Sequence, residues 1–213
     1  LGSPVYRDLA VPPVMRFIDK LPVVTEGRAA VFVTWGGANS GLALWQMATA
    51  LAAKNYTIVG AAKVMAVHSM LWTEEAPVGA GRPNGDDDAI VSAWARELVG
   101  DGRAPLDLDL LRYQAQTFEK SVLERIDSPW QIIPKTVDPE ACTECGTCAT
   151  VCPVAAVSLA PGPVFADTCF DCFNCIRECP EEAISPVIPL SQISAMIRER
   201  VATFDERPHT RVW

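Results

Sequence analysis

The feature that most constrains the fold of this chain is a cysteine pattern that occurs twice. Cys142–Cys152 and Cys169–Cys179 both follow the spacing C-x2-C-x2-C-x3-C, and a proline follows each run. Matched cysteines are 27 residues apart, and the two runs contain all eight cysteines of the chain. The region is short and poor in large apolar side chains, so we expect its folding to depend on what the thiols bind.

Disulfides and zinc are two alternatives for these thiols. Eight cysteines can pair as disulfides in about a hundred ways, but a C-x2-C-x2-C triplet is too crowded for unstrained disulfide geometry. Tetrahedral zinc has no use for a third cysteine at such close spacing. Both alternatives therefore fit the pattern less well than a larger metal group does.

The double pattern resembles that of bacterial ferredoxins, which carry two 4Fe-4S clusters and in which the fourth cysteine of each run binds the other cluster. The resemblance implies an α+β two-cluster ferredoxin-like domain, with clusters that either transfer electrons or only stabilise the fold. Carried over to this chain, it implies one ligand set of Cys142, Cys145, Cys148 and Cys179, and a second set of Cys169, Cys172, Cys175 and Cys152.

The chain is acidic, with a formal net charge of −8 over 213 residues, which disfavours nucleic acid as a partner. Between residues 138 and 184 there are eight acidic residues and one base, Arg177. An acidic face of this kind suits a redox partner with a basic docking face. We expect no membrane span, because the longest apolar stretches fall short of about 18 residues. Cysteines without a disulfide pattern indicate a reducing, anoxic cytoplasm.

Residues 1–100 alternate short apolar runs with helical periods, which predicts a parallel sheet with crossover helices. We expect helices over residues 12–21, 42–54 and 86–100, and buried strands over 29–35 and 56–67. The helix over 12–21 places Phe17 and Ile18 on one apolar side. Two loops would follow strands at the edge where ligands bind in such sheets, "GSPVYR" at residues 2–7 and "TWGGANSG" at 34–41.

The stretches "GSPVYRDLAVPP", "AAVFVTWGGANSGLALWQMATALAAKNYTIVGAAKVMAVHSM" and "GAGRPN" resemble the second half of the flavodoxin-like domain in flavodoxin-ferredoxin fusion proteins. The cysteine pattern follows that domain in the same family. The resemblance implies a doubly wound α/β sheet and an FMN ring flanked by the two loops. Its candidate contacts here are Ser3, Pro4, Tyr6, Thr34, Trp35, Gly36, Gly37 and Asn39.

One departure from that family concerns the FMN phosphate. Flavodoxins bind the phosphate on a Ser/Thr/Gly-rich loop after their first strand, and no such loop precedes Gly2. Three strands and two helices, roughly 70 residues by ordinary element lengths, would lie upstream. We expect the sequence to be a fragment; the alternative is that the flavin site is lost.

The remaining segments divide the chain further. We expect the C-terminal half of a flavodoxin-like domain over residues 1–100, a helical connector and linker over 101–136, the two-cluster domain over 137–187, and a C-terminal helix and tail over 188–213. The connector would hold a helix with an apolar stripe over 111–126, and the last helix would begin at Ser191.

These features predict an electron-transfer protein that passes low-potential electrons through two 4Fe-4S clusters, to or from an FMN in the complete flavodoxin-like domain. The alternative is a flavin- and cluster-containing oxidoreductase subunit that acts on a specific substrate. A third possibility is a flavin-free docking platform beside a working ferredoxin. No residue stands out as catalytic, although Lys63 and His68 are ionisable groups near the expected ligand edge, where His68 reads as a structural residue.

Overall fold

A computed structural model describes residues 1–100, 102–112, 124, 128–159 and 161–213. The chain divides into two compact units, which are described separately. The first comprises Leu1–His68, Thr73–Ile126 and Ile197–Trp213, and the second comprises Ser69–Trp72 and Asp127–Met196. The second unit contains all eight cysteines.

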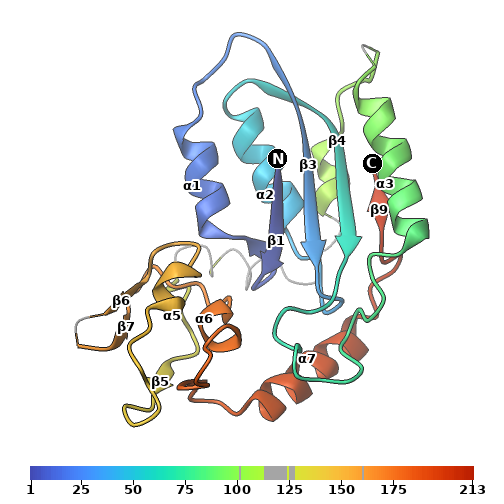
Figure 1. Cartoon of the computed structure of the whole chain (residues 1–213). Coiled ribbons are helices and arrows are strands. Elements are labelled where there is room, and N and C mark those ends of the chain that lie inside the picture. The colour runs from blue at the N-terminus through green and yellow to red at the C-terminus, as the bar shows by residue number, and fades with distance from the viewer. Residues whose placement is uncertain (101, 113–123, 125–127, 160) are drawn as a thin grey trace. The chain divides into compact units, whose positions relative to one another are not determined.

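The first unit is built on a five-stranded sheet in the order β2-β1-β3-β4-β9 (Figure 1). Its strands are β1 (Gly2–Tyr6), β2 (Leu9–Ala10), β3 (Gly27–Trp35), β4 (Tyr56–Met65) and β9 (Arg211–Val212). The central strands β1, β3 and β4 are parallel, whereas the short outer strands β2 and β9 pair antiparallel. The predicted mixed α/β fold with parallel strands is confirmed.

Helices cover both faces of this sheet. Neighbouring residues of β4 point to opposite faces, so they contact different helices. Ala61 packs in the core with Met47 and Leu51 of α2, whereas a side chain at Gly60 would meet Trp94 and Leu98 of α3. The helical elements of the unit are α1 (Pro12–Lys20), α2 (Ala43–Ala52), α3 (Gly85–Leu98) and the 3-10 helix η1 (Leu108–Arg112).

The ends of these helices follow from local sequence. Two prolines open α1, where a missing backbone N–H costs nothing. At α3 the Asn84 side chain accepts hydrogen bonds from the N–H groups of Asp86 and Asp87, and the Asp87 carboxylate accepts one from the Asn84 N–H. This reciprocal cap fixes the helix start, and the acidic first turn complements the helix dipole.

The second unit repeats its own backbone as well as its cysteines. Helices α5 (Thr147–Thr150) and α6 (Asn174–Arg177) are 27 residues apart, as are strands β6 (Val157–Leu159) and β8 (Ile184–Pro186). The same offset relates three pairs of residues with positive φ: Glu144 and Asp171, Gly146 and Phe173, Ala155 and Glu182. Because non-glycine residues rarely adopt positive φ, the sequence repeat is also a structural repeat.

Strand pairing in the second unit exchanges partners between the two repeats. Strand β5 (Lys135–Val137) precedes the first cysteine run and pairs with β8, which follows the second run. Strand β7 (Pro163–Phe165) precedes the second run and pairs with β6, which follows the first. Each two-stranded sheet therefore joins the beginning of one repeat to the end of the other.

Other expectations meet mixed outcomes. The last helix is confirmed as α7 (Leu190–Phe204). Phe17, predicted on the apolar side of the first helix, is 52% exposed, so only Ile18 of that pair is buried. The predicted helix over 111–126 lies almost wholly outside the described residues. Within the part of the chain that the structure describes, no helix is long and apolar enough to cross a membrane.

Candidate metal centre

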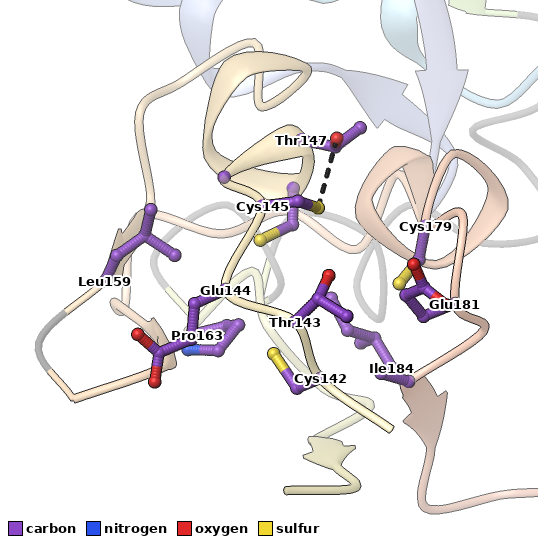
Figure 2. Close-up of a pocket in the computed structure, with 13 residues that line it drawn as sticks. Cys142, Thr143, Glu144, Cys145, Thr147, Leu159, Pro163, Cys179, Glu181 and Ile184 are labelled. Atoms are coloured by element: carbon purple, nitrogen blue, oxygen red, sulfur yellow. Dashed lines mark hydrogen bonds between the residues drawn. The ribbon is translucent and has the colours of Figure 1, made fainter. Parts of the chain in front are cut away.

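Cys142, Cys145, Cys148 and Cys179, the outer cysteine set, line one pocket of about 320 Å³ that is partly open to solvent. Figure 2 shows Cys142 and Cys145 on the loop before α5, and Cys179 on the separate segment after α6. The pocket thus brings together three thiols of the first repeat and the last thiol of the second. This is the grouping that the ferredoxin resemblance implies.

The remaining thiols, Cys152, Cys169, Cys172 and Cys175, form the inner cysteine set. Cys169 and Cys175 are buried. Cys152 ends the first repeat, and its Sγ accepts a hydrogen bond of 3.2 Å from the N–H of Ala156. Burial raises the pKa values of Cys172 and Cys175, and the charge of Cys152 raises both further.

The outer set lies among polar and exposed groups. Cys145 is exposed, and its thiol donates a hydrogen bond of 3.3 Å to the Thr147 hydroxyl, which can donate in turn to the thiolate (Figure 2). That hydrogen bond lowers the pKa of Cys145. Glu144 and Glu181, both exposed, also line the pocket. A cluster bound at this site would therefore be accessible to solvent and close to negatively charged side chains.

The inner set lies beside a buried ion pair. The Nζ of Lys135 is 2.6 Å from Oδ1 of Asp171 and 3.5 Å from Sγ of Cys169, and the Lys135 side chain is 0% exposed. Burial alone would lower the pKa of Lys135, but the Asp171 carboxylate outweighs it and the pKa is raised. The ammonium charge is thus retained next to a candidate ligand.

The thiol chemistry of both sets fits iron binding. All eight cysteines lie within the described residues and are free of disulfides. Burial raises the pKa of Cys148, and it raises the pKa of Cys175 to about 12. Because metals bind thiolates, binding at these sites would release protons. Among the described residues, no three His, Cys, Asp or Glu side chains converge on a single ion. A four-iron cubane holds its thiolates farther apart, because each binds a different iron.

Comparison with known proteins agrees with this geometry. Residues 135–180 match the family described as a 4Fe-4S dicluster domain. The match supports a ferredoxin-like iron-sulfur domain with a 4Fe-4S cluster over these residues, and it suggests iron-sulfur electron transfer. No curated protein matches the chain.

The predicted loop at residues 2–7 is wrong, because most of it is strand β1, whose residues pair in register with β3. The residues predicted to contact FMN lie within β1, at the carboxyl end of β3 and in the turn after β3. The two strands are adjacent and parallel, and Pro4 is in register with Thr34. Both of these residues are exposed, and Tyr6 and Gly36 are half-buried. The other four candidates are buried: Ser3, Trp35, Gly37 and Asn39.

Several of these buried groups are engaged by the chain itself. The Ser3 hydroxyl accepts a hydrogen bond of 3.0 Å from the Val11 N–H. Trp35 Nε1 donates to the carbonyl of His209 at 2.8 Å, and the His209 ring meets the indole edge-on. The Asn39 carbonyl oxygen accepts from the Gly41 N–H at 2.6 Å. These hydrogen bonds therefore join β1, β3 and the turn after β3 to neighbouring segments of the chain.

The C-terminal segment contributes a buried acid to this edge that the sequence reading missed. The Glu206 carboxylate accepts a hydrogen bond of 2.7 Å from the Ser40 N–H and also bonds the Ser40 hydroxyl and the Lys63 ammonium. Coulombic attraction to Lys63 outweighs the effect of burial and holds the pKa of Glu206 below its usual value. Nothing local in the sequence links residues 143 positions apart.

His68 lies near the same edge as a structural group. A side chain at Gly36 would come within 2.6 Å of the His68 ring, so the ring packs directly against the loop. Burial lowers the pKa of His68 to about 4, which keeps the imidazole neutral at pH 7. This packing agrees with the structural role expected from the sequence.

Proposed function

We propose that this chain is an electron-transfer module whose eight cysteines bind two 4Fe-4S clusters through crossed ligation. The outer cysteine set holds one cluster, and the inner cysteine set holds the other. A bound 4Fe-4S cluster exchanges single electrons at a potential set by charge, hydrogen bonds to sulfur and exposure. The grouping of Cys179 with the first-repeat thiols around one pocket carries the proposal.

Two further observations support crossed ligation. The exchange of strand partners joins the end of each repeat to the beginning of the other, which is the arrangement that crossed ligation needs. Cys148 and Cys175, one from each repeat, pack in the same buried cluster with Ile184. Sites packed this closely favour fast electron exchange between them.

The outer cysteine set is the port through which electrons enter or leave. Cys145 is exposed and its pocket is partly open to solvent, although Cys148 of the same set is buried. In the inner set, Cys169 and Cys175 are buried and no cysteine is exposed. Seven of the eight acids between residues 138 and 184 are exposed, and only Asp171 is buried. A redox protein with a basic docking face suits this surface, and its association would weaken as salt screens the charges.

FMN in a complete flavodoxin-like domain is the other half of the proposed electron path. The family resemblance supports it, and so does the pairing of β1 with the carboxyl end of β3, which brings Pro4 beside Thr34. An oxidoreductase acting on its own substrate would need a free acid or base at that edge, where Glu206 is paired with Lys63 and the His68 ring packs against Gly36. Electron carriage is therefore the stronger proposal, in a reducing compartment such as the cytoplasm.

Anaerobic reconstitution with iron and sulfide tests the two-cluster proposal. We expect about eight irons and about eight inorganic sulfides per chain, with the electron paramagnetic resonance spectrum of reduced 4Fe-4S clusters. Stoichiometric zinc or disulfide bonds in place of iron would overturn it. The flavin proposal is tested separately by the FMN content of the full-length protein, where about one FMN per chain supports it and none opposes it.

A further inference from the structure

The Lys135–Asp171 ion pair distinguishes the inner cysteine set from the outer one. Lys135 begins β5, and Asp171 lies between Cys169 and Cys172 in the second cysteine loop. The ammonium is 3.5 Å from Cys169 Sγ, and the Asp171 carboxylate oxygen is 3.8 Å from the same sulfur. Both charges therefore lie against a candidate ligand.

The pair is held rigidly from several sides. Oδ2 of Asp171 accepts hydrogen bonds from the N–H groups of Ile132 and Ile133 at 2.7 and 2.9 Å. The Lys135 ammonium lies over the rings of Phe165 and Phe173, at 5.7 and 5.3 Å from their centroids. A buried charge fixed in this way is poorly screened by water and salt, so its field acts strongly on its neighbours.

The chemistry of an adjacent cluster makes that field important. Reduction adds one negative charge to the cluster, and burial in a low-dielectric environment opposes this charge. A neighbouring ammonium that donates an N–H to a ligand sulfur favours the reduced form and offsets the Asp171 carboxylate. We propose that Lys135 raises the reduction potential of the cluster bound by the inner cysteine set, which rests on the proposed two-cluster function.

The outer cysteine set offers an internal contrast. Glu144 occupies the position that matches Asp171, with nearly the same φ of 55° against 56°. Glu144 is exposed, and the described residues include no lysine or arginine within ion-pair distance of it. Among the residues that the structure describes, the outer set therefore has no buried cation at the position that matches Asp171, and we expect only one of the two potentials to depend on Lys135.

The test measures both potentials in the reconstituted chain by potentiometric titration with dithionite as the electron donor. Lys135→Met should lower one potential and leave the other unchanged. Asp171→Asn keeps an acceptor for the backbone N–H groups and should raise the same potential. The double variant should fall between the two single variants. Arg177→Gln, which removes a half-exposed cation whose side chain is 42% exposed, is the control and should move neither potential.

The outcomes separate this proposal from the two-cluster proposal. An equal shift of both potentials in Lys135→Met, or no shift, overturns the role of Lys135 while leaving the clusters in place. Iron and sulfide contents far below about eight each in the unaltered chain overturn the two-cluster proposal itself. If the Lys135→Met variant does not bind the inner cluster, the potential is measured in Asp171→Asn and in the double variant instead. An unchanged potential in both variants overturns the proposal.

Discussion

The two cysteine repeats share their ligand spacing and their backbone but differ in their surroundings. In the first repeat, Thr143 and Gly146 occupy the positions between the cysteines, whereas the second repeat has Phe170 and Phe173 there. Phe170 and Phe173 are 6% and 1% exposed. Two aromatic residues thus convert an open loop into a buried one without altering the cysteine spacing.

This difference shows that some residues of the motif set the backbone path while others set the surroundings of a bound cluster. The cysteines and the positive-φ residues set the path of the loop, because both repeats follow it with different side chains. The intervening residues set burial and charge, which control how a bound cluster responds. Two ligand sets with the same cysteine spacing can therefore hold one cluster that is accessible to a redox partner and another that is buried in the domain.

The largest expected effect comes from removing pairs of cysteines that distinguish crossed from uncrossed ligation. Cys145→Ala with Cys179→Ala removes two ligands of the outer set, so the chain should keep about four of eight irons. Cys172→Ala with Cys179→Ala removes one ligand from each set and should damage both clusters. Iron analysis after anaerobic reconstitution checks this. The opposite ranking of the two double variants would mean that each repeat binds its own cluster.

The second prediction concerns the buried aromatic of the second repeat. Phe173→Ala should lower the free energy of unfolding of the iron-loaded chain by about 3–5 kcal/mol, because it opens a cavity beneath the loop. It also removes the edge contact with Trp72, whose ring centroid lies 6.4 Å away. Anaerobic denaturant titration measures the change.

The control for Phe173→Ala is an apolar truncation at an exposed position of the same unit. Val164 is 51% exposed, and Val164→Ala should change the free energy of unfolding by no more than about 0.5 kcal/mol. Equal losses in the two variants would show that burial does not distinguish the repeats.

Sequence patterns predicted the features that depend on residues close together in the chain, and they missed the contacts between residues far apart. The cysteine spacing is local, and it identified the iron-sulfur region that the family match confirms. Apolar runs and periodicity predicted strands β3 and β4 and helices α1 and α2, and the acids Asp86, Asp87 and Asp88 predicted α3, each to within a few residues. Such patterns lie within one element, so no knowledge of the tertiary fold was needed.

The interactions that sequence reasoning missed join distant residues. Lys135 and Asp171 lie 36 positions apart, and Lys63 and Glu206 lie 143 apart. In the sequence, Asp171 looked like one more acid of a solvated acidic surface, yet folding buries it opposite a lysine. A charged residue reads as exposed by default, because burial of a charge requires a partner that only the fold reveals.

A third prediction tests the backbone of the first repeat. Gly146 has φ of 79°, and an added Cβ would come within 3.4 Å of the Leu159 side chain. Gly146→Ala should cost about 1 kcal/mol of unfolding free energy, mainly because alanine disfavours positive φ. The control is Thr143→Ala, an exposed position of the same loop, and the measurement is again anaerobic denaturant titration. An unchanged free energy of unfolding would show that this loop accepts a side chain at Gly146, as the second repeat accepts Phe173 at the matching position.

The smallest expected effect concerns the hydrogen bond at the exposed thiol. Thr147→Val removes the hydroxyl that lies 3.3 Å from Cys145 Sγ, so the outer potential should fall while the inner one stays fixed. The matched residue of the second repeat is Asn174, whose backbone N–H bonds the Cys172 sulfur, so Asn174→Ala should leave both potentials unchanged. Because water replaces part of a lost hydrogen bond at an exposed site, the shift should be smaller than that of Lys135→Met. A larger shift would mean that the outer site is more shielded from solvent than the exposure of Cys145 indicates.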